Sequence, residues 1–234
     1  MNARDFLKAA TDPDGWLRMS VTLRASANAL WDCFFRATLQ YAKSCAGERV
    51  GDVAKWDEAV GYLTVAKMLY GLALETVLKA YLLRHTPEEI EFRLSADGLN
   101  NLTSAEIRQF GVPMGEGHNL LRLAEKAGVF MSDEGAVFPI ESDRIAVREI
   151  LKHLGECVMW RSRYPIPKKT GEEHMPSPDV PAKVLGHYIR DWLDPLLDHL
   201  QSNISPSFEP ENTVSRTTAV QNNPGIVTRP VFRG

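Results

Sequence analysis

The residues best suited to chemistry gather in one short stretch, "RSRYPIPKK" at 161–169. It holds four cations and one phenol ring: Arg161, Arg163, Tyr164, Lys168 and Lys169. Cations neutralise phosphates and an aromatic ring stacks on a base, so this cation cluster could hold single-stranded RNA or a nucleotide. The same residues could instead end a helix, because cations stabilise a helix C-terminus and Pro165 cannot continue one. The sequence leaves both interpretations open.

Glu75 and Lys79 form a second polar group, inside a long apolar segment. Residues four apart meet on one side of a helix, and Lys67 and Gly71 fall on the same row. This spacing favours an ion pair on a polar stripe, worth a few tenths of a kcal/mol. If the row lies beside the helix that carries Arg148, Glu75 and Lys79 would instead line a groove.

His118 opens the segment "HNLLRLAEKAG" at 118–128. We expect its ring to cap or orient the start of a helix, and the alternative is that it joins Glu75 and Lys79 in lining a groove. No second histidine or carboxylate stands near it at the spacing of a metal site. The sequence therefore predicts no metal and no cofactor.

The composition limits the class of protein. The chain has 234 residues, 44% of them hydrophobic, and a net charge of −3, which fits one main globular domain. Any contact with nucleic acid must be a local patch, because the whole chain is not basic. Cys33, Cys45 and Cys157 are widely spaced, which suggests neither a disulfide framework nor a zinc site. With no apolar leader and no run of about 18 apolar residues, we expect a cytoplasmic protein.

The elements that must position these residues are helices. Apolar residues recur at spacings of three and four over 21–44, 56–85, 118–128 and 142–158, which is the period of one helical face. Ser142 or Asp143 is expected to cap the last of these helices, and Pro165 to end it. The sequence therefore predicts an all-α, antiparallel up-and-down helical bundle over residues 1–167.

The remaining segments are predicted to be additions to this bundle. Residues 86–116 contain several turn signals and are read as an insertion with one short helical piece over 104–110. A Pro-rich connector follows at 168–181, then an extra C-terminal helix at 182–202 in which Pro195 should introduce a kink. Residues 203–234 have little to bury and are predicted to be a disordered tail.

Three stretches together resemble the HEPN family, named for higher eukaryotes and prokaryotes nucleotide-binding. They are "LETVLKAYLL" at 74–83, "GHNLLRLAEKAG" at 117–128 and "WRSRYP" at 160–165, and the resemblance covers roughly residues 21–167. The family's members form antiparallel helical bundles, often as dimers, and work in toxin–antitoxin pairs, phage defence and RNA cleavage. The resemblance thus implies a HEPN-like bundle and a homodimer.

The resemblance also implies a catalytic pair, Arg148 and His153. Active members carry an arginine and a histidine separated by four to six residues on the last core helix, and these two stand at the matching place. The histidine would take the proton of a ribose 2′-hydroxyl, and the arginine would stabilise the charge on phosphorus. Glu149 departs from the Asn, Asp or His that usually follows the arginine. On a regular helix the two side chains point about 140° apart, so a dimer or a distorted turn would have to unite them.

We therefore expect an RNA- or nucleotide-binding protein of a prokaryotic defence or toxin–antitoxin context. If Arg148 and His153 act together, it is a metal-independent endoribonuclease, with an antitoxin or another defence protein as its partner. The alternative is a non-catalytic helical module that dimerises or binds a partner through its surface.

Overall fold

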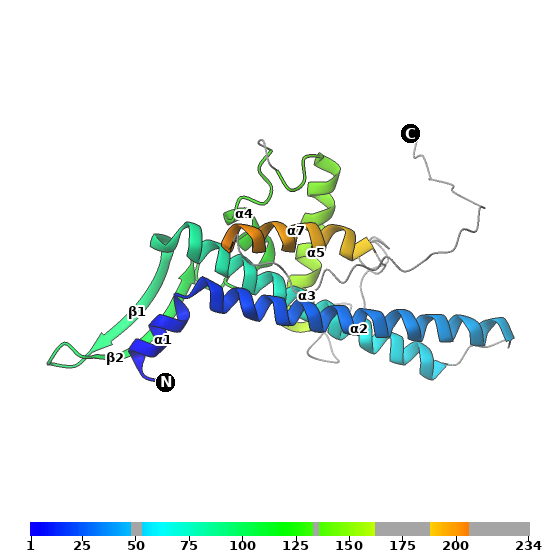
Figure 1. The fold of residues 1–234 in the computed structure, drawn as a ribbon, viewed down its shortest axis with the longest axis horizontal. Coiled ribbons are helices and arrows are strands. Elements are labelled where there is room, and N and C mark those ends of the chain that lie inside the picture. Colours follow the sequence, from blue (N-terminus) through cyan, green and yellow to red (C-terminus); the bar gives the residue numbers. More distant parts are fainter. Residues whose placement is uncertain (48–52, 133–135, 162–187, 206–234) are drawn as a thin grey trace, which may run out of the picture.

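Two long antiparallel helices form the centre of the protein (Figure 1). The computed structural model describes residues 1–47, 53–132, 136–161 and 188–205. Helix α2 spans Pro13–Gly47 and helix α3 spans Val53–His85, so both predicted helices are present and longer than predicted. A short helix, α1 (Ala3–Ala10), precedes α2. None of the helices within these described ranges is long and apolar enough to cross a bilayer.

Small residues let α2 and α3 pack closely. Ala27, Ala66 and Ala73 are fully buried, and the Ser20 hydroxyl donates to the Ala73 carbonyl across the interface at 2.8 Å. Large apolar side chains fill the space on either side of this line of small residues, among them Leu17, Trp31, Tyr70, Leu74 and Leu78. The result is a core along α3, which packs against α2, the later helices and the end of the β-hairpin described next.

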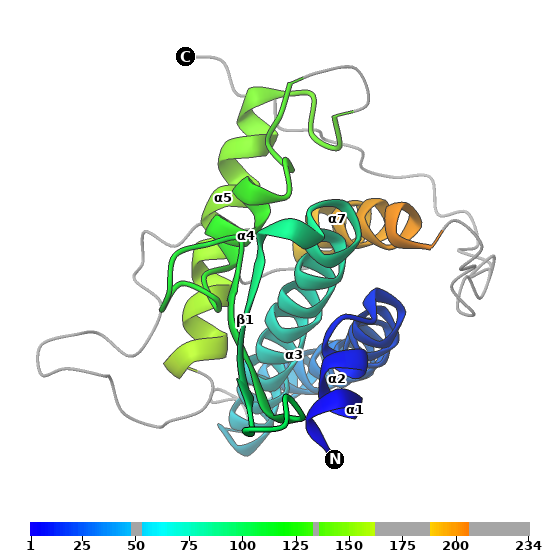
Figure 2. The same ribbon diagram turned by 90° about the vertical axis from the view of Figure 1, so that its left-hand side faces the viewer.

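Residues 86–116 form a β-hairpin, which corrects the prediction of an all-α fold. Strand β1 (Ile90–Ala96) pairs antiparallel with β2 (Leu102–Phe110), after a single 3-10 turn at Pro87–Glu89. The predicted helical piece over 104–110 is therefore wrong. The Asp97 carboxylate accepts from the amides of Leu99 and Asn101, and this turn closes the hairpin. The ribbon extends from one end of the helices (Figures 1 and 2) and is buried only at its base.

Helices α4 (Leu120–Lys126) and α5 (Glu141–Glu156) pack on α3, and α5 continues into one π-helical segment, η2 (Cys157–Arg161). Ile140 precedes α5 without a side-chain cap, so the predicted cap by Ser142 or Asp143 is wrong. The α5 helix crosses α3 steeply in the view of Figure 1. The helical class is confirmed, with the hairpin added, and a HEPN-like bundle stays a prediction.

The last described helix, α7 (Tyr188–Ile204), lies on the α2–α3 pair. Its buried face consists of Leu193, Leu196, Leu197, Leu200 and Ile204. The helix continues past residue 202, and Ile204 is fully buried, so the predicted start of the tail at 203 is wrong. The connector at 168–181, the predicted helical residues 182–187 and the chain from 206 lie outside the described residues.

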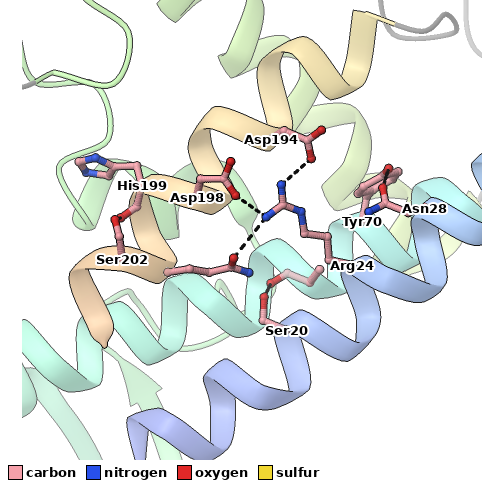
Figure 3. Close-up of polar contacts among 10 residues, drawn as sticks. Ser20, Arg24, Asn28, Tyr70, Asp194, Asp198, His199 and Ser202 are labelled. Carbon is pink, nitrogen blue, oxygen red and sulfur yellow. Dashed lines mark hydrogen bonds and ion pairs between the residues drawn. The ribbon is translucent and has the colours of Figure 1, made fainter. Parts of the chain in front are cut away.

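Arg24 fixes α7 to α2 (Figure 3). Its guanidinium donates to the carboxylates of Asp194 at 2.7 Å and Asp198 at 2.5 Å, and to the side-chain carbonyl of Gln201 at 3.2 Å. Burial acts to lower the pKa of Arg24, but the hydrogen bonds to Asp198 and Asp194 outweigh it and raise that pKa above its ordinary value. A single side chain on α2 thus makes three polar contacts with α7.

Replacing Arg24 should therefore loosen α7. We expect Arg24→Met to lower the free energy of unfolding by about 2 kcal/mol, because both aspartates lose a charged hydrogen-bond donor. Arg18→Met is the matched control, since Arg18 is an exposed arginine of the same helix that pairs with Asp12, and it should cost less than about 0.5 kcal/mol. Urea denaturation measures both values. Equal effects of the two changes would show that Arg24 does not hold α7.

Candidate functional site

A row of polar residues on α3 faces the helix that carries Arg148. Lys67, Gly71, Glu75 and Lys79 recur every fourth residue, and Gly71 marks the closest approach. A Cβ atom at Gly71 would lie 2.5 Å from a methyl carbon of Val158 and 3.0 Å from the Leu154 carbonyl oxygen, so only glycine fits. The row therefore lies directly beneath the end of α5 and the start of η2.

The row is buried, although the spacing alone favoured an ordinary polar stripe. The Glu75 and Lys79 side chains are 10% and 8% exposed, and Lys79 Nζ lies 2.6 Å from Glu75 Oε1. The Lys79 ammonium also lies over the rings of Phe110, 5.0 Å from the centroid, and Trp16, at 6.0 Å. The predicted ion pair is present, in a setting where losing either partner would leave an uncompensated buried charge.

His118 completes this group from the loop before α4. Its Nδ1 lies 2.9 Å from the same Glu75 Oε1 that binds Lys79. Asn119 caps α4 instead, accepting from the Arg122 amide, so the predicted capping role of His118 is wrong. The other carboxylate oxygen, Glu75 Oε2, is buried without a hydrogen-bond partner among the described residues. Glu75, itself paired with Lys79, therefore binds the Nδ1 edge of the His118 ring.

His118 also lines a pocket between the loop before α4 and α5. The cavity has a volume of about 330 Å³, within the range of sites for small molecules. This His118 pocket is lined by Gly115, Glu116, His118, Asn119, Leu151, Lys152, Gly155, Glu156 and Met159. The His118 side chain is 57% exposed, so it can touch a bound molecule while Glu75 holds it from behind.

Arg148 and His153 have different partners within the chain. Arg148 Nη1 lies 2.6 Å from Glu125 Oε1, and its guanidinium stacks 4.0 Å above the Phe130 ring centroid. His153 is buried, and its Nε2 lies 3.6 Å from Cys157 Sγ. Since α5 is a regular helix over Glu141–Glu156, the angular separation expected for five residues is not removed by any distorted turn between the two.

The cation cluster begins where η2 ends. Arg161 is the last residue of η2, and Arg163, Tyr164, Lys168 and Lys169 lie outside the described residues. Helices of this wide type often interrupt α-helices near functional sites. Here η2 packs on α3, with Val158 against Gly71, so the start of the cluster is anchored beside the row.

No family model, curated protein or solved structure matches the chain. The HEPN resemblance therefore stays a prediction, and the site has to be argued from its own geometry. Within the described ranges, no three His, Cys, Asp or Glu side chains gather where they could hold a metal ion.

Sequence reasoning missed the residues of α5 that line the pocket. Lys152, Glu156 and Met159 follow at spacings of four and three, which places them on one exposed face and gave a usable signal. Glu116 and Asn119 flank His118 in the sequence, so they too could have been named. What the sequence could not show is that these two segments meet.

Lys67 is the other unusual member of the row. Burial lowers the pKa of Lys67 to about 8, against a smaller electrostatic contribution from Cys157 that raises it. Below pH 8 the folded and unfolded chains both carry the proton, and the folded state bears the full cost of a buried charge. As pH rises from about 8 toward 10.5, the folded chain loses its proton first and that cost disappears.

We therefore expect Lys67→Met to stabilise the protein near neutral pH, by up to about 3 kcal/mol. The advantage over the wild-type chain should shrink between pH 8 and 10.5, which two sets of urea denaturations would measure. Lys55→Met controls for the introduction of methionine at a solvent-accessible site of the same helix. A constant difference between wild type and Lys67→Met across this range would contradict the assignment.

Proposed function

We propose that the protein binds RNA or a nucleotide, with one nucleoside unit in the His118 pocket and its phosphates on the cation cluster. The supporting observation is the continuity of the two features along the chain. The pocket wall ends at Met159, and the cluster begins at Arg161, the last residue of η2. A base and the phosphates attached to it could therefore be held by neighbouring parts of one segment.

The chemistry of the pocket suits the uncharged part of such a ligand. Met159 is exposed and offers apolar surface to a base, and the amide of Asn119 can donate to it. Glu156 disfavours a phosphate placed inside the pocket, whereas the charge of Glu116 is offset by its ion pair with Arg122. The phosphates are thus favoured outside the pocket, where Lys152 is available to them.

RNA cleavage by Arg148 and His153 is not part of this proposal. The buried imidazole of His153 has no exposed face of the kind that a substrate needs, and Arg148 already neutralises Glu125. The endoribonuclease activity, the homodimer and the defence or toxin–antitoxin context remain predictions from the resemblance. The binding proposal uses only residues near the pocket and the cation cluster.

A matched pair of lysines tests the proposal. Lys152 and Lys55 each pair with a glutamate three residues away and are similarly exposed, but only Lys152 lines the pocket. We expect Lys152→Ala to weaken binding of a fluorescent oligouridylate about three- to tenfold, because one charged contact is lost. Lys55→Ala should leave the affinity unchanged. Fluorescence anisotropy over a range of salt concentrations measures both.

The same titrations locate the phosphates. Neutralising Arg163 and Lys168 together should reduce the slope of log affinity against log salt by about 1.4, the value expected for two contacts to a single strand. If the wild-type protein binds neither the oligouridylate nor free uridine nucleotides, the proposal is wrong. The non-catalytic partner-binding module would then replace it.

A further inference from the structure

His118 has one ring nitrogen that does not meet Glu75, and this nitrogen is Nε2. Glu75 Oε1 is a carboxylate oxygen and can only accept, so His118 Nδ1, at 2.9 Å, must carry the proton of this hydrogen bond. In a neutral imidazole the other nitrogen, Nε2, then has a free lone pair. The two ring nitrogens point in diverging directions, so Nε2 points away from Glu75, and His118 is one of the residues that line the pocket.

Lys79 binds the same Glu75 oxygen that meets His118. Its ammonium lies 2.6 Å from this carboxylate oxygen, and Phe110 and Trp16 pack against the ammonium. An oxygen that already accepts from an ammonium is available to His118 only as an acceptor. The buried ion pair therefore fixes which nitrogen of His118 is the acceptor.

An acceptor nitrogen selects ligands that present a hydroxyl or amine hydrogen. A phosphate oxygen would be repelled by the lone pair and by the carboxylate of Glu156, so the complementary group belongs to the sugar or the base. The 2′-hydroxyl is the sugar group that RNA has and DNA lacks, and it can donate one hydrogen bond.

We propose that His118 Nε2 accepts a hydrogen bond from the ribose 2′-hydroxyl of the unit in the pocket, so that the protein selects RNA over DNA. This inference rests on the proposed function, because it requires a nucleoside unit in the pocket. His118 is the contacting residue, and Glu75 and Lys79 are positioning residues that act through it.

The experiment compares a short oligouridylate with the matching oligodeoxyuridylate, which differ only in the 2′-hydroxyl. The wild-type protein should bind the ribose form about fivefold more tightly through this one hydrogen bond. In His118→Asn the amide nitrogen can still donate to Glu75, but nothing replaces Nε2. This change should remove most of the ribose preference, because the ribose strand loses one hydrogen bond that the deoxy strand never makes.

One double variant and one control distinguish residues that position the His118 ring from the residue that contacts the ligand. Glu75→Gln combined with Lys79→Met removes both buried charges at once and leaves no uncompensated ion. A glutamine can meet Nδ1 as donor or acceptor, so the ribose preference should fall about two- to threefold while deoxy binding persists. His85→Asn is the control for the same substitution at an exposed histidine outside the pocket lining, and it should behave like wild type.

An unchanged ratio of ribose to deoxyribose affinity in His118→Asn would overturn the inference and leave the proposed function intact. Equal loss of both strands in His118→Asn would also overturn it, because His118 would then contact something other than the 2′-hydroxyl. Failure of the wild-type protein to bind either strand would overturn the inference together with the proposed function.

Discussion

The buried ion pair between Glu75 and Lys79 is the interaction on which the candidate site depends. Two charges removed from water are tolerated only when each meets its partner and further polar or aromatic groups. Lys79 forms an ion pair with Glu75 and lies over the rings of Phe110 and Trp16. Glu75 is bound by Lys79 and by His118. The pair thus ties α3 to the base of the hairpin, to the start of α2 and to the loop before α4.

The other elements bring the pocket to this pair. Because Gly71 has no side chain, the end of α5 can approach α3 closely. Lys152 and Met159, near this end, line the pocket together with the loop before α4. The hairpin supplies Phe110 from its buried base, and its exposed remainder plays no part in the site. The α2–α3 pair provides the rigid support, and Arg24 adds α7 to its other side.

The sequence predicted the features that follow from local periodicity. The two long helices and the pairing of Glu75 with Lys79 rest on spacings of three and four residues, which a helix makes physical neighbours. The hairpin was not predicted because only Ile90 and Phe110 of its strands are buried, so no alternating apolar pattern identifies it. The contact between His118 and Glu75 joins residues 43 apart, and no local rule predicts such a pairing. The burial of His153 was not predicted for the same reason, because it depends on which helix packs over this residue.

The protonation state of the His118 ring tests the central claim most directly. The ¹⁵N chemical shifts of its two ring nitrogens, measured by NMR while the imidazole is neutral, report which nitrogen carries the proton. We predict a proton on Nδ1 and a bare Nε2 in the wild-type chain, and loss of this preference in the variant that combines Glu75→Gln with Lys79→Met. A proton on Nε2 in the wild-type chain, or the same shifts in both proteins, would contradict the account.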